Sequence, residues 1–153
     1  MYLFFDTETT GLPRNWKAPV TDLSNWPRLV QLAYLVYDES GRKLHEQSFI
    51  IQPDGWSIDP GAAAVHGISE ARARREGVPL QHAMQDLAEQ LMQVSTLVAH
   101  NMAFDSKIVG AEYLRTFGSN PLDGKKKLCT METSTDILQL PGYYGYKWPK
   151  LDE

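Results

Sequence analysis

The hydrophobic pattern predicts three short strands in the first third of the chain. Residues 1–6 are apolar nearly throughout, which predicts a central strand covered on both faces. Residues 29–37 (LVQLAYLVY) and 44–51 predict two more strands around a turn at 39–42, and together the three form an antiparallel meander. Residues 9–27 predict a long loop with prolines and tryptophans, and loops of this length inside compact domains are usually functional.

Helical signals follow the meander. Asp59 and Pro60 predict a helix start, with a short helix that Gly67 can stop, and a second short helix is expected over residues 70–75. The clearest helix begins at Pro79, because an apolar stripe recurs there at helical spacing. The stripe consists of Leu80, Ala83, Met84, Leu87, Leu91 and Met92.

The last third of the chain predicts a strand, a helix and another strand. Residues 96–99 (TLVA) predict a short buried strand, residues 103–117 a helix, and residues 127–131 an edge strand. The tail at residues 140–150 (LPGYYGYKWPK) is rich in Gly, Pro and Tyr and predicts an ordered loop. A meander followed by helix, strand, helix and strand predicts one α/β domain over residues 1–153, with a mixed sheet flanked by helices.

Composition narrows the class of protein. With 42% hydrophobic and 22% charged residues, the 153-residue chain is typical of one soluble globular domain. No apolar stretch approaches the roughly 20 residues of a membrane span, so no membrane partner is expected. The single cysteine, Cys129, excludes an internal disulfide and favours the cytoplasm. The net charge of −4 argues against a large basic surface for duplex nucleic acid.

Two acids end the first strand. Side chains alternate along a strand, so Asp6 and Glu8 point to the same side, about 6.6 Å apart. They repel each other, and no Arg or Lys adjoins them in the sequence. If the two acids have a structural role, distant cations such as Arg72 or Arg75 neutralise them. If they have a functional role, they bind a divalent Mg²⁺ or Mn²⁺ ion, because both ions prefer hard oxygen ligands.

The turn behind these acids is suited to a bound ligand. In residues 9–12 (TTGL) the glycine lets backbone N–H groups approach a ligand closely. Leu12 at its end is placed to pack against a base.

A third acid follows the strand at residues 96–99. If that strand lies beside the first, Asp105 comes to the same sheet end as Asp6. Taken alone, Asp105 also fits an acid at a helix N-terminus whose negative charge interacts favourably with the helix dipole. Asn101 is placed to bond either a nucleotide or the turn, and Phe104 either to stack on a base or to pack in the core.

Three stretches, FDTETTGL, AVHGIS and HNMAFDSKIVGAEY, resemble motifs of the DEDD 3′–5′ exonuclease superfamily, which includes the proofreading subunit of bacterial replicative polymerase. The resemblance covers nearly the whole chain and implies a ribonuclease-H-like fold. It implies two Mg²⁺ or Mn²⁺ ions held by Asp6, Glu8 and Asp105. It also implies substrate contacts from Thr9, Thr10, Gly11, Leu12, His66, Asn101 and Phe104. For His66, a role in holding the HGI turn is an equal alternative.

The family's third motif has no counterpart in this sequence. That motif supplies a late His or Tyr as general base and a fourth metal-binding Asp, whereas the chain after Trp148 continues only to Glu153. We therefore expect an exonuclease domain that lacks its last helix and third motif, and that is weakly active or inactive as given. The histidine type of base is preferred, because the rest resembles the proofreading type.

Three hypotheses for function follow. The first is a metal-dependent 3′–5′ exonuclease that removes nucleoside monophosphates from a single-stranded 3′ end of DNA or RNA, with a polymerase or repair complex as a possible partner. The second is a nucleic-acid-binding module of the same fold that never cleaves. The third is a structural scaffold with incidental acids.

Overall fold

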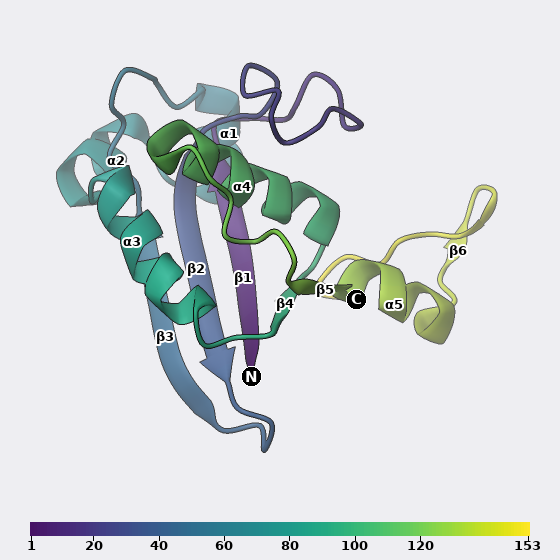
Figure 1. Cartoon of the computed structure of the whole chain (residues 1–153). Helices are drawn as coiled ribbons and strands as arrows, with labels where there is room; N and C mark the ends of the chain where they lie inside the picture. Colours follow the sequence, from purple (N-terminus) through teal and green to yellow (C-terminus); the bar gives the residue numbers. More distant parts are fainter.

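The computed structural model describes residues 1–153 and consists of a five-stranded sheet with helices packed on it, plus a small two-stranded hairpin (Figure 1). The elements, in chain order, are β1 (Tyr2–Thr9), β2 (Leu29–Tyr37), β3 (Lys43–Ile50), α1 (Pro60–His66), α2 (Glu70–Glu76), α3 (Leu80–Leu91), β4 (Thr96–Ala99), α4 (Met102–Phe117), β5 (Lys126–Cys129), α5 (Thr130–Leu138), β6 (Pro141–Gly142) and β7 (Gly145–Tyr146).

The strand order is β3-β2-β1-β4-β5. Strand β1 is antiparallel to β2 and parallel to β4, β2 is antiparallel to β3, and β4 is parallel to β5. The predicted mixed sheet, with an antiparallel meander and parallel strands, is therefore confirmed. So is the edge position of β5. Strand β1 is hydrogen-bonded on both sides and forms the centre of the sheet.

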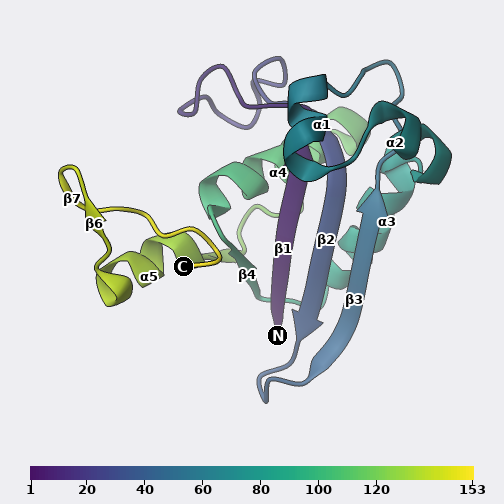
Figure 2. The ribbon, with the colours of Figure 1, turned by 180° about the vertical axis from the view of Figure 1, so that it is seen from behind.

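Helices α3 and α4 cover one face of the sheet (Figure 1). From β1, Leu3 and Phe5 point into the main core, where they join Met84 and Leu87 of α3 and Ile108 of α4. A smaller core lies at the end of the sheet where α1 and α2 pack (Figure 2). It is made by Val30, Ile58, Ile68 and Ala73.

The other face of β1 is open, so the prediction that this strand is covered on both faces is wrong. Exposed and covered side chains alternate along β1, and Tyr2 and Phe4 keep 40% and 39% of their surface in water. Both are aromatic, so their side of the strand looked as apolar in sequence as the covered side. Asp6 and Glu8 follow at the same spacing and therefore emerge on this open face.

Local signals placed the helix ends well. Asp59 accepts a hydrogen bond from the Gly61 N–H at 2.7 Å, and Gly67 ends α1 with a φ of 75°, which glycine adopts without strain. The apolar stripe of α3 is buried at Ala83, Met84, Leu87 and Leu91. Its last predicted member is wrong: Met92 caps the helix and is exposed, because the stripe ends with the helix.

Three elements after β5 were missed, helix α5 and strands β6 and β7, and residues 130 and 131 of the predicted edge strand belong to α5. Helix α5 has no buried residue, so it leaves no apolar stripe. Its hydroxyl groups instead bond carbonyl groups four residues back, as Thr133 does to Cys129 at 2.8 Å and Ser134 to Thr130 at 2.6 Å. Strands β6 and β7 then form a short hairpin that projects from the body of the molecule (Figure 1).

A buried charge network on α4 holds the end of the long loop. Glu112 is fully buried, and its Oε1 accepts from Arg28 Nε at 2.8 Å and lies 3.1 Å from Arg115 Nη1. Arg115 Nη2 donates in turn to the carbonyl groups of Leu23 and Trp26, at 2.6 and 2.7 Å. Helix α4 therefore fixes the chain where it leaves the loop and enters β2.

Removal of the Glu112 carboxylate should destabilise the fold, because Arg115 would stay largely buried without its partner. We expect Glu112→Ala to lower the free energy of unfolding by about 3 kcal/mol, measured by urea denaturation. Glu112→Gln keeps an acceptor oxygen and should lose less than half as much. Equal stability of parent and Glu112→Ala would show that the network does not hold the loop.

Candidate active site

Asp6 and Glu8 stand on the open face without a cation. No ion pair in the structure includes either carboxylate. Arg72 and Arg75, the distant cations that were the structural alternative, pair with Glu76 at 2.8 and 2.6 Å. That alternative is therefore wrong, and neither carboxylate is paired with an Arg or Lys.

Asp105 reaches β1 from the covered side of the sheet. It lies in the first turn of α4 and is only 3% exposed. Its Oδ1 accepts two hydrogen bonds from Thr7, from the backbone N–H at 3.1 Å and from the hydroxyl at 2.6 Å. Since Thr7 stands between Asp6 and Glu8 in the strand, these bonds bring the third carboxylate to the residues that carry the other two.

Burial disfavours the ionised form of each of the three carboxyl groups, and the charge of Asp6 adds to this effect at Glu8 and Asp105. Burial raises the pKa of Asp105 to about 7; the Thr7 hydroxyl opposes this shift, and the charge of Asp6 adds to it. Burial also raises the pKa of Asp6 above its usual value. Burial and then the charge of Asp6 raise the pKa of Glu8. Binding of a positive ion to these carboxyl groups would therefore be electrostatically favourable.

The turn after β1 is held by its own hydroxyl groups. Thr9 Oγ1 donates to the Gly11 carbonyl at 2.7 Å, and Thr10 Oγ1 accepts from the Arg28 N–H at 3.0 Å. A return bond from the Thr10 N–H to the Arg28 carbonyl is also 3.0 Å long. Leu12 is left 73% exposed, so it is a surface residue and does not belong to the core.

His66 holds a turn and keeps one unused donor. Its Nδ1 accepts from the Ile68 N–H at 3.1 Å, as expected of a residue that holds the HGI turn. The ring proton is therefore on Nε2, which is buried without a hydrogen-bond partner. The imidazole is close enough to Glu8 to lower the pKa of that carboxyl, in opposition to burial.

Asn101 and Phe104 flank the start of α4. Asn101 adopts a φ of 79°, which asparagine tolerates better than most residues, and its side chain makes no cap hydrogen bond. Phe104 is partly buried and packs against the main core, so packing accounts for one of its faces. The rest of the Phe104 side chain is not covered by the core, and Asp105 is the next residue in the sequence.

Residues 3–152 match the profile of a protein family described as Exonuclease. The chain belongs to this exonuclease family. The resemblance seen in the sequence motifs is therefore confirmed. No curated protein matches the chain.

Solved structures of exonuclease I share the ribonuclease-H-like fold of this exonuclease-family chain. The E. coli enzyme in complex with a dT13 oligonucleotide is 18% identical, with a TM-score of 0.74 over 97% of this chain and 33% of that chain. Its complex with a dA16 oligonucleotide is 18% identical, with a TM-score of 0.75 over 97% of this chain and 34% of that chain. A product-bound exonuclease I is 21% identical, with a TM-score of 0.72 over 99% of this chain and 34% of that chain. The chain thus spans about a third of the exonuclease I chains.

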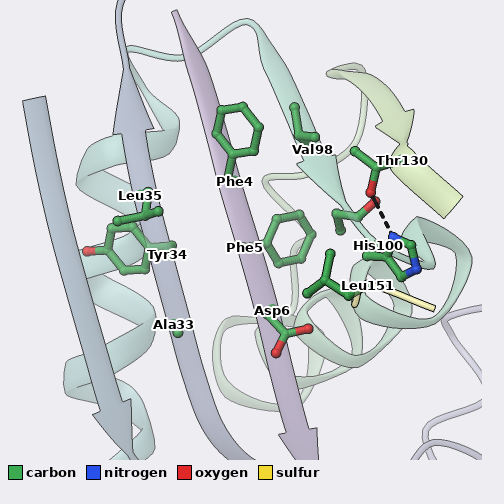
Figure 3. Close-up of a pocket in the computed structure, with 11 residues that line it drawn as sticks. Phe4, Phe5, Asp6, Ala33, Tyr34, Leu35, Val98, His100, Thr130 and Leu151 are labelled. Atoms are coloured by element: carbon green, nitrogen blue, oxygen red, sulfur yellow. Dashed lines mark hydrogen bonds between the residues drawn. The ribbon is translucent and has the colours of Figure 1, made fainter. Parts of the chain in front are cut away.

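A groove of about 270 Å³ runs along the open face of this exonuclease domain (Figure 3). Aromatic and aliphatic side chains of β1, β2 and β4 line one end of it, while Asp6, His100 and Leu151 stand at the other (Figure 3). The groove therefore leads from an apolar surface to one of the candidate metal ligands.

His100 was not singled out from the sequence. It follows β4 directly, and its charge lowers the pKa of Asp6 against the effect of burial. Its Nδ1 lies 3.0 Å from Thr130 Oγ1 and its Nε2 lies 3.0 Å from the Pro149 carbonyl, so it joins three segments beside the groove. Its place at the carboxyl end of a strand next to β1 was the available signal.

The donor set suits a divalent cation in chemistry but is not gathered into one ligand group. Asp6, Glu8 and Asp105 offer hard oxygen atoms, and none of the three carboxylates forms an ion pair with an Arg or Lys. No three or more His, Cys, Asp and Glu side chains lie close enough together to hold a metal ion. The metal site stays a prediction.

None of the helices has the length and the apolar character that crossing a membrane requires.

The raised pKa of Asp105 predicts a pH dependence of stability in the metal-free protein. An acid whose pKa is higher in the folded state stabilises the fold at low pH, and this contribution is lost as pH rises towards about 7. Relative to Asp105→Asn, which keeps an oxygen for both Thr7 bonds, the parent should lose melting temperature between about pH 4 and pH 7. If the melting temperatures of the parent and Asp105→Asn change in parallel with pH in the presence of a chelator, the raised pKa of Asp105 is contradicted.

Proposed function

We propose that this chain carries the site of a metal-dependent 3′–5′ exonuclease, which hydrolyses the terminal phosphodiester bond of a single strand and releases nucleoside monophosphates. Family membership supports hydrolysis of nucleic acid from an end. The observation that carries the proposal is the set of Asp6, Glu8 and Asp105 at the carboxyl end of β1, where Asp105 is bonded to Thr7 and no Arg or Lys pairs with Asp6 or Glu8.

Asp6, Glu8 and Asp105 would hold Mg²⁺ or Mn²⁺. When bound, two such ions lower the pKa of an attacking water and stabilise charge on the phosphate and the leaving oxygen. The chain itself orients the donors. Thr7 holds Asp105 by two hydrogen bonds, and the unpartnered Nε2–H of His66 can donate to a phosphate oxygen beside Glu8.

Single-stranded DNA is the substrate favoured by the comparisons, since exonuclease I of the same fold has been solved with dT13 and dA16 oligonucleotides. The low identity of 18% means that this likeness supports the proposal through the fold alone. RNA remains the alternative substrate. The exposed side chain of Leu12 offers an apolar contact for a terminal base of either kind.

A nucleic-acid-binding module that does not cleave is the second candidate. The observation that favours it is the absence of three or more potential ligands close enough together to hold a metal. The two candidates differ in one measurable property, because only the nuclease requires the carboxylates to bind a divalent cation.

Mn²⁺ binding should raise the melting temperature of this chain in a concentration-dependent way, because the ion binds the folded state. Asp6→Asn should abolish most of the increase. Asp54→Asn changes an exposed acid that belongs to no candidate site and should respond like the parent. If Asp6→Asn shifts as much as the parent, the cation binds elsewhere and the binding module is favoured.

The product of the whole reading frame that encodes these residues should release nucleoside monophosphates from a 3′-labelled single strand in Mn²⁺. Asp6→Asn and Asp105→Asn should each slow release by about 100-fold or more, since electrostatic stabilisation of the transition state is lost. Product identity, followed by chromatography, separates 3′ exonuclease action from internal cleavage. Unchanged rates in both variants would contradict the assigned site.

A further inference from the structure

The long loop of residues 10–28 is an ordered structure that presents Trp16. Lys107 Nζ from α4 donates to the carbonyl groups of Trp16 and Ala18, at 3.2 and 3.0 Å. Asn15 and Asn25 close the loop on itself with reciprocal hydrogen bonds of 2.7 and 2.9 Å. The backbone that carries the Trp16 side chain is therefore fixed to α4.

The indole of Trp16 lies against the ring of Phe104. The ring centroids are 5.5 Å apart and the rings are inclined by 42°. Trp16 nevertheless keeps 51% of its surface in water, while Phe104 is packed against the core on its other side. Phe104 directly precedes Asp105 in the first turn of α4, so one ring of the aromatic pair lies on the same helical turn as one of the candidate metal ligands.

A purely structural role does not account for this arrangement. The loop is already tied to α4 by Lys107, Arg115 and the Glu112 network, so Trp16 is not needed to hold it. Trp26 of the same loop is 3% exposed and supplies the buried indole that packs the loop on the core. Trp16 leaves large apolar surface in water, which is typical of a binding surface.

We propose that Trp16 and Phe104 form a stacking platform for an unpaired base of the substrate strand, and so make the site selective for single-stranded ends. This inference rests on the proposed function. Aromatic rings stack on any base through its π face, without reading its hydrogen-bonding edge. A base inside a duplex already has its faces covered by neighbours, so it reaches the platform only after unpairing and unstacking.

The test is binding of a fluorescein-labelled single-stranded oligo-dT, followed by anisotropy in Ca²⁺ without Mg²⁺ or Mn²⁺. Trp16→Ala should weaken binding by about 5- to 100-fold, the usual effect of removing one stacking ring. Trp16→Phe keeps a ring and should stay within about threefold of the parent. Tyr144→Ala removes an exposed aromatic from the distant hairpin tip and should bind like the parent.

A second readout does not depend on the alanine variant being folded. Oligo-dT stacked on the indole should quench the intrinsic fluorescence of the parent, and Trp16→Phe should lose that quench while still binding. The affinity of the parent for a blunt duplex should also be lower than its affinity for the single strand.

Two results would overturn the inference in distinguishable ways. If the parent binds oligo-dT and Trp16→Ala binds it equally well, or if the quench persists in Trp16→Phe, the platform is absent and the exonuclease proposal stands. If the folded parent binds neither single strand nor duplex, the proposed function fails, and the stacking platform fails with it.

Discussion

Strand β1 carries both the core and the candidate site, because it is hydrogen-bonded on each side and sends alternate side chains to opposite faces. Leu3 and Phe5 anchor the helices on the covered face, while Asp6 and Glu8 emerge on the open one. A slip of one residue would bury the acids among apolar side chains and expose the core. The hydrophobic effect and the cost of burying charge therefore act together to fix the register on which the site depends.

Thr7 links the two faces of the sheet at the site. It points to the covered side, where both its backbone N–H and its hydroxyl bind Asp105, while its neighbours in the strand carry the other two carboxylates. The fold thus brings acids to the end of β1 and pairs none of them with an Arg or Lys. A divalent ion bound there would relieve the repulsion between these acids, and its binding would therefore stabilise the folded state.

Helix α4 organises most of what surrounds these acids. Asp105 in its first turn contacts β1, Lys107 holds the loop backbone at Trp16, and Glu112 holds the chain where β2 begins. A single rigid element therefore positions a candidate ligand and the loop beside it. Loops of this length are usually mobile, and here α4 supplies hydrogen bonds that replace the missing secondary structure.

The sequence by itself determined the strands of the meander, the ends of α1, the mixed sheet and the three acids, since alternation, caps and motifs are local properties of neighbouring residues. Only the tertiary structure decided that Tyr2 and Phe4 face water, because exposure depends on what packs above a strand. Helix α5 was likewise invisible, since it buries no apolar stripe. The bonds from Thr7 to Asp105 join residues 98 positions apart, and contacts of that range exist only once the chain has folded.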